Sequence, residues 1–62
     1  MNENRWKGKK VLVVEDSDEI RADIVKVYKK FGLEVVAEAA DGLVAIEQLK
    51  KNKPDYISMD IV

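Results

Sequence analysis

Three carboxylates are the residues of this 62-residue chain best suited to chemistry. Glu15 and Asp16 follow an unbroken aliphatic run, and Asp60 lies within a second apolar segment. A short continuous β-branched run is typical of a central strand in a parallel sheet, which places its functional residues at the carboxyl ends of its strands. If the two segments are neighbouring parallel strands, the three carboxylates converge at one edge of the sheet.

Converging carboxylates favour a metal site. Like charges at close range cost stability unless a cation balances them. The chain has no histidine and no cysteine, so its ligands are oxygens, which select a hard ion such as Mg²⁺. Mg²⁺ retains several waters and can bridge to a phosphoryl oxygen. A carboxylate can also be the nucleophile that accepts a phosphoryl group as an aspartyl phosphate.

Each acidic residue also has a purely structural explanation. Asp16 could have no role beyond capping the helix that follows it, and Glu15 could be a solvated residue at the end of a strand. The structural explanation is weaker for Asp60, because an acidic residue inside an apolar strand is unfavourable without a partner. The acidic pair at one strand end and the single aspartate at another together indicate a metal site more specifically than any one of the three residues does alone.

Hydrophobic periodicity predicts three strands and two helices in alternation. The strands are expected at 10–15, 34–39 and from about 55 to the terminus, and the helices at 17–31 and 43–51. This β-α-β-α-β order predicts a parallel sheet with right-handed crossovers. If the second crossover passes back over the first strand, the sheet order is 2-1-3, one helix covers each face, and the acidic residues meet at the switch point.

Local signals set the expected ends and faces of the helices. Asp16 or Ser17 caps the first helix and Asp41 the second, while Gly32 and Pro54 end them. The predicted apolar face of the first helix comprises Ile20, Ile24, Val27 and Phe31, with Tyr28 beside it. In the second helix it comprises Ala45, Ile46 and Leu49, and the core residues of the second strand are Val35 and Val36.

Composition excludes several classes of function. The net charge of −1 gives no broad basic field for nucleic acid. No apolar run approaches the roughly 20 residues that span a bilayer, and no secretory signal is visible, so a cytoplasmic protein without membrane contact is expected. Residues 1–9 form a polar lead whose Trp6 is expected to cap the sheet rather than bind a ligand, and 10–62 form the domain.

The third strand is expected to be an apolar edge. In the 2-1-3 order one row of its backbone groups is unpaired, and it carries Ile57, Met59, Ile61 and Val62. We therefore expect that the chain is part of a longer domain, or that it completes its sheet by pairing with another copy.

Together these residues resemble the receiver domain of two-component response regulators. Residues 11–17 are similar to the family's first strand with its acidic pair, 39–42 to the turn into its second helix, and 53–60 to the strand that ends in the phosphoacceptor. The resemblance implies a truncated flavodoxin-like (CheY-like) doubly wound fold, of which this chain is the amino-terminal half. It also implies a signalling domain rather than an enzyme.

The resemblance assigns roles to particular residues. Asp60 is the phosphoacceptor, with a histidine kinase as the donor. Asp16 and Asp60 bind Mg²⁺ through their side chains, Glu15 acts mainly through a metal-bound water, and the backbone carbonyl of Val62 is a further ligand.

The family's remaining strands, with their Ser or Thr and their Lys, have no counterpart here, which implies impaired transfer. The alternative hypothesis is a non-catalytic half-domain that forms a homo-oligomer through the third strand. A dinucleotide-binding half-fold is weaker, because an acidic turn replaces G-x-G-x-x-G.

Overall fold

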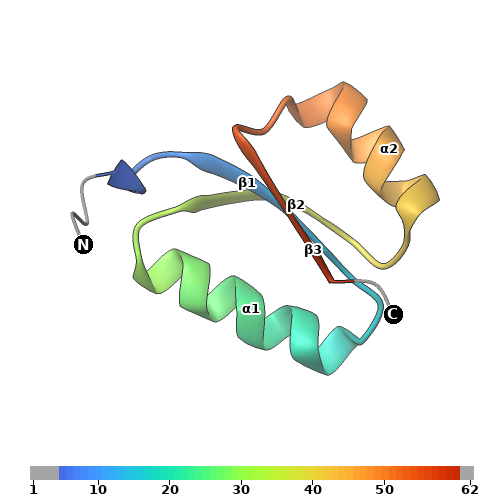
Figure 1. Ribbon diagram of the computed structural model, residues 1–62, viewed down its shortest axis with the longest axis horizontal. Helices are drawn as coiled ribbons and strands as arrows, with labels where there is room; N and C mark the ends of the chain where they lie inside the picture. The colour runs from blue at the N-terminus through green and yellow to red at the C-terminus, as the bar shows by residue number, and fades with distance from the viewer. Residues whose placement is uncertain (1–4, 61–62) are drawn as a thin grey trace.

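The computed structural model describes residues 5–60 as a three-stranded sheet with a helix on each side (Figure 1). The elements are β1 (Lys10–Glu15), α1 (Asp18–Lys30), β2 (Glu34–Ala39), α2 (Gly42–Asn52) and β3 (Tyr56–Asp60). All pairs are parallel and the sheet order is β2-β1-β3. The predicted fold class, element order and sheet order are confirmed.

The central strand β1 forms the core of the molecule. Its aliphatic residues 11–14 are each at most 2% exposed, because helices cover both faces of the strand. Alternate residues of a strand point to opposite faces. Val11 and Val13 therefore pack with Val25 of α1 on one face. Leu12 and Val14 pack with Ala39 of β2 and Ala45 of α2 on the other face.

The start of each helix is capped by a side chain. Ser17 Oγ accepts a hydrogen bond from the backbone N–H of Ile20 at 3.2 Å, so the structure selects Ser17 rather than Asp16 as the cap of α1. Asp41 Oδ1 accepts from the backbone N–H of Val44 at 2.9 Å, as predicted for α2. These bonds satisfy helix donors that have no partner within the helix.

The helix ends also follow the predicted signals. Gly32 has a φ of 88°, a conformation that glycine adopts without steric cost, and it ends α1 as expected. The α2 helix ends with Lys53 in the left-handed region at a φ of 41°. Pro54 follows directly and disfavours a helical conformation at the residue before it.

The buried face of α1 differs from the predicted stripe. Val25 is buried, whereas Ile20, Val27 and Phe31 are 50%, 49% and 49% exposed. Of the predicted face, Ile24 packs against the core, together with Tyr28 beside it. The reason is that α1 contacts β1 and β2, so the side of the helix toward β3 is left partly uncovered.

The predicted faces of α2 and β2 also need correction. Ile46 is 52% exposed, and Val44 packs against the core in its place. In β2 the fully buried residue is Ala39. Val35 is half-buried and packs against the cluster of Val11, Val13 and Val25, as predicted, and Val36 is also half-buried. The register shifts at a bulge after Val35, and β2 is an edge strand, so its fully buried residue lies at its carboxyl end, in the sheet's other core cluster.

The described part of the amino-terminal lead is docked on the domain. The Trp6 ring lies 5.5 Å from the ring of Tyr56, at the start of β3. The backbone N–H of Gly8 donates to the carbonyl of Gly32 at 2.9 Å. This agrees with the prediction that the indole of Trp6 caps the sheet.

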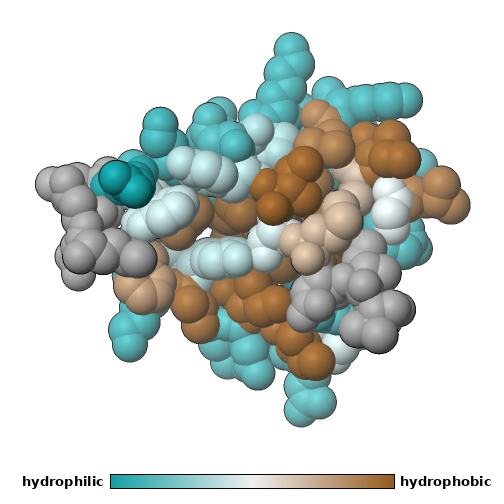
Figure 2. All heavy atoms as spheres, viewed as in Figure 1, coloured by the Kyte–Doolittle hydropathy of each residue, from teal (hydrophilic) through white to brown (hydrophobic). Residues whose placement is uncertain are grey.

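The β3 strand is the least covered element of the described structure. Among the described strands it pairs only with β1, and the backbone of neither helix comes close to it. Ile57 is 45% exposed and Met59 is 60% exposed, while Tyr28 Oη donates to Ser58 Oγ at 2.8 Å. Figure 2 shows hydrophobic side chains over α1 and over α2, with β3 running between them. Residues of α1 and β3 line an apolar groove of about 340 Å³, among them Val27 and Phe31.

Across residues 5–60, neither helix has the length and apolar character that crossing a membrane would require.

Candidate functional site

The candidate site lies at the carboxyl ends of β1 and β3. The last residue of each strand, Glu15 and Asp60, form a register pair. Neighbouring strands lie about 4.8 Å apart, so the two backbones are adjacent at this edge. The sequence prediction that these strand ends meet is thereby confirmed for the backbone. The side chain of Asp60 and all of Val62 lie outside the described part of the structure.

Glu15 is buried to an extent that is unusual for a carboxylate. It is 3% exposed, and its Oε2 accepts a hydrogen bond from the backbone N–H of Ser17 at 2.8 Å. A buried carboxylate needs such partners, because its transfer from water is otherwise costly. The alternative explanation of Glu15 as a solvated strand end is therefore wrong.

Asp16 is exposed and lies in the turn that leaves β1. The capping bond of α1 belongs to Ser17, so the explanation of Asp16 as the helix cap is wrong. Glu15 and Asp16 thus differ sharply in environment although they are neighbours in the chain. One carboxylate is buried and hydrogen-bonded, and the other is open to solvent at the same edge of the sheet.

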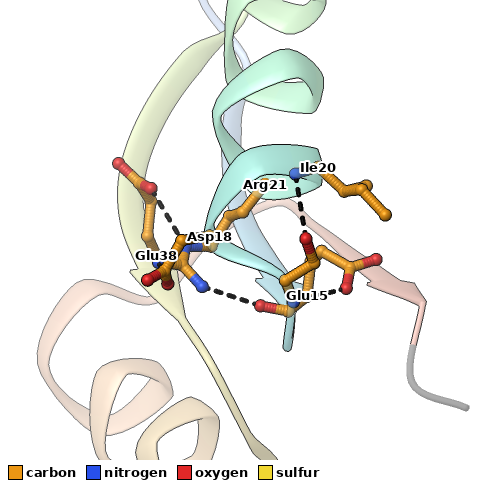
Figure 3. A network of polar contacts seen from close by, with 6 residues as sticks. Glu15, Asp18, Ile20, Arg21 and Glu38 are labelled. Atoms are coloured by element: carbon orange, nitrogen blue, oxygen red, sulfur yellow. Dashed lines mark hydrogen bonds and ion pairs between the residues drawn. The ribbon is translucent and has the colours of Figure 1, made fainter.

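Arg21 joins this edge of the sheet to α1, as Figure 3 shows. Its Nη1 donates to the backbone carbonyl oxygen of Glu15 at 2.8 Å. Its Nη2 donates to Asp18 Oδ1 at 2.5 Å, and its Nε to Glu38 Oε1 at 3.3 Å. The hydrogen bond to Asp18 is the main cause that raises the pKa of the Arg21 guanidinium, so this group remains positively charged at any accessible pH.

Sequence reasoning did not single out Arg21. A signal for it was present, because the dipole disfavours a cation near the amino end of a helix unless an acidic side chain accompanies it. Asp18 stands three residues earlier and supplies that partner. The contact with Glu38 depends on how β2 is placed beside β1, which local spacing does not reveal.

The donor set of the described residues fits a hard cation but does not complete a site. The side chains described within residues 5–60 contain no group of three acidic, histidine or cysteine residues close enough to hold a metal ion. Two of the predicted ligands, the Asp60 carboxylate and the Val62 carbonyl, lie outside the described part. Glu15 and Asp16 offer only oxygen ligands, which suit Mg²⁺ rather than a softer metal.

Comparison with known proteins decides the family. The sequence profile described as the response regulator receiver domain matches residues 11–62, which include both acidic strand ends. The chain belongs to this family. The resemblance inferred from the sequence is thus confirmed, and so is the flavodoxin-like (CheY-like) character of the fold.

Several curated relatives share this region. The chain is 43% identical over 54 residues to the chemotaxis protein CheY of Thermotoga maritima, covering 87% of this chain and 45% of that protein. It is 42% identical over 52 residues to CheY of Bacillus subtilis, covering 84% and 43%. It is 40% identical over 53 residues to the transcriptional regulatory protein PdtaR of Mycobacterium tuberculosis, covering 86% and 26%.

The chain thus spans less than half the length of these relatives. Receiver domains are signalling domains of response regulators, and most are not enzymes themselves. Family membership therefore supports a role in two-component signalling, whereas the residue-level chemistry of this chain is a separate proposal.

Proposed function

We propose that this chain is the phosphoacceptor portion of a receiver domain, with Asp60 as the phosphoacceptor and a histidine kinase as the donor. The observation that carries the proposal is the register pair of Glu15 and Asp60 at the carboxyl edge of the sheet. The exposed Asp16 stands at that same edge. Membership in the receiver family supports the same assignment.

The proposed transfer needs one nucleophile. A carboxylate oxygen of Asp60 forms a bond with the phosphorus while the P–N bond of the donor's phosphohistidine breaks, and the electron pair of that bond goes to the ring nitrogen. Glu15, Asp16, Asp60 and the carbonyl of Val62 are the proposed Mg²⁺ ligands, with Glu15 acting mainly through a metal-bound water. The bound cation supplies neutralisation of the charge on the transferring group.

Glu15 and Asp16 have different roles in this proposal. Glu15 is buried and held by the N–H of Ser17, so its carboxylate is fixed before any ligand arrives. Asp16 is exposed, so its carboxylate can exchange water for a cation at little cost. A fixed acid beside an accessible one suits a site that binds and releases Mg²⁺ readily.

Intact-mass measurement tests the proposal. The chain is incubated with Mg²⁺ and a small acyl-phosphate donor, in which a P–O bond breaks in place of the P–N bond. We expect a single phosphoryl adduct that forms slowly, because residues 1–62 contain no counterpart of the family's later Lys and Ser or Thr. The adduct is expected to disappear when EDTA removes the metal. Absence of any adduct from a sample that circular dichroism shows to be folded would contradict the proposal.

A second candidate function is self-association through β3, which would make the chain a homo-oligomer. It is favoured by the exposure of Ile57 and Met59 on a strand that pairs on one side only among the described strands. An apolar strand with unpaired backbone groups is a ready template for another strand. A second copy offers the same edge, so that the two can pair by symmetry.

Replacing Met59 by Lys is expected to weaken this association about tenfold, since a charge then replaces an exposed apolar side chain of β3. Sedimentation velocity over a range of concentrations measures the dissociation constant. The matched control is Leu43→Lys, because Leu43 is 78% exposed and belongs to α2, whose backbone makes no close contact with β3. A wild-type chain that stays monomeric at millimolar concentration would rule out this candidate.

A further inference from the structure

Arg21 connects the three elements that surround the carboxyl end of β1. Its side chain starts on α1, reaches the last carbonyl of β1 and meets Glu38 of β2 (Figure 3). Asp18 accepts from the same guanidinium. The side chain is 17% exposed, so most of it is shielded from solvent between these partners.

The bond to Glu15 differs in kind from the other two. Asp18 and Glu38 are exposed, with 90% and 49% of their side chains accessible, and ion pairs at such positions add little stability. The carbonyl of Glu15 instead belongs to the backbone at the point where β1 ends. A bond at that atom fixes the direction in which the chain leaves the sheet.

The residues on both sides of Asp16, Glu15 and Ser17, are held by hydrogen bonds. On one side, the Glu15 carbonyl accepts from Arg21 at 2.8 Å. On the other side, the N–H of Ser17 donates to the Glu15 carboxylate at 2.8 Å, and the Ser17 carbonyl accepts from the backbone N–H of Arg21 at 2.8 Å. The turn that carries Asp16 is therefore tied to the first turns of α1 rather than left to the loop alone.

We infer that Arg21 is a positioning residue of the proposed Mg²⁺ and phosphoacceptor site, acting through the carbonyl of Glu15 to set the placement of Glu15 and Asp16. This inference rests on the proposed function. Arg21 touches neither the metal nor the phosphoryl group. Its planar fork of donors serves three acceptors at once, which the single ammonium of a lysine cannot reproduce.

The sign of the effect on Mg²⁺ binding separates positioning from simple electrostatics. A positive charge close to a cation site repels the cation, so removal of Arg21 would tighten Mg²⁺ binding if its charge were all that mattered. If Arg21 instead positions the carboxylates, its removal weakens binding. Partners that orient metal ligands are typically worth 10-fold or more in affinity.

Isothermal titration of Mg²⁺ into Arg21→Met and wild-type chains tests the inference. We expect about tenfold weaker binding by Arg21→Met. The matched control is Lys26→Met, which removes an exposed cation from the same helix and is expected to leave affinity unchanged or slightly higher. Affinity of Arg21→Met equal to or above that of the wild type would overturn the inference.

Two further variants separate the three contacts of Arg21. Asp18→Asn and Glu38→Gln weaken its ion pairs but leave the bond to the Glu15 carbonyl in place, so we expect less than a threefold change in Mg²⁺ affinity. Arg21→Lys keeps the charge and is expected to recover only part of the loss. Weakening of Mg²⁺ binding by Asp18→Asn that matches Arg21→Met would mean that the ion pair, not the carbonyl contact, is responsible, which overturns the inference.

Amide hydrogen exchange in the metal-free chain separates this inference from the proposed function. In Arg21→Met we expect faster exchange at Ser17 and Ile20, whose N–H groups donate within the turn, and unchanged exchange in the middle of β1. Unchanged exchange at both positions overturns the positioning role even if Mg²⁺ binds. Faster exchange in a protein whose wild type binds no Mg²⁺ shows that the contact orders the turn, while the proposed function fails and the link to a metal site fails with it.

Discussion

Replacing Asp60 by Asn is expected to abolish the phosphoryl adduct formed with Mg²⁺ and a small acyl phosphate. The amide has no anionic oxygen to attack phosphorus, although its shape is almost that of the carboxylate. The expectation rests on the register pair with Glu15, which places the Asp60 backbone at the acidic edge of the sheet. Intact mass spectrometry with peptide mapping measures both the amount and the position of the adduct.

The same strand supplies a matched control for this experiment. Asp55 precedes β3 at its opposite end, where its Oδ2 accepts from the backbone N–H of Lys10 at 2.8 Å. Asp55→Asn is therefore expected to keep the adduct in full. If the adduct persists in Asp60→Asn, or maps to another carboxylate, Asp60 is not the phosphoacceptor.

Replacing Leu12 by Ala is expected to remove most of the stability of the chain. Leu12 is 0% exposed at the centre of the cluster between β1 and α2. Truncating such a residue costs about 3 kcal/mol, from lost burial and from the cavity that remains. A core in a chain of this size supplies no more than about 3–5 kcal/mol in total, so the variant is expected to be largely unfolded at 37 °C.

Urea unfolding followed by circular dichroism measures this loss. The control is the same substitution at Leu43, which is 78% exposed on α2 and is expected to change the free energy of unfolding by less than about 0.5 kcal/mol. Equal unfolding midpoints for Leu12→Ala and Leu43→Ala would show that the core does not lie where the structure places it.

Hydrophobic periodicity predicted that α1 is a helix but did not predict which of its residues are buried. The spacing of Ile20, Val27 and Phe31 correctly indicated a helix, because that pattern arises from the 3.6-residue repeat. It did not show which part of the apolar surface is covered. Val25 is buried although it lies outside the predicted stripe, because α1 packs on β1 and β2 and leaves its β3 side half exposed.

The candidate site likewise has features that could be predicted from the sequence and features that could not. The order of strands and the acidic residues at their ends could be predicted, since alternating strands and helices permit few topologies. The difference between a buried Glu15 and an exposed Asp16 could not, because it depends on the path of the turn into α1. Ser17 and Asp16 were equally good caps by residue type, and only the geometry of that turn selects Ser17.

For this protein the sequence by itself determined the features that depend on interactions between residues close together in the chain. Strand and helix periods, the Asp41 cap and the Gly32 stop depend on residues within a few positions of one another. The tertiary structure decided what depends on distant segments. Arg21 meets Glu38, which is 17 residues away, because β2 lies beside β1 with a bulge in its register. The edge position of β3 was predicted from the order of the elements, whereas the exposed fractions of its apolar side chains depend on where α1 and α2 lie relative to that strand.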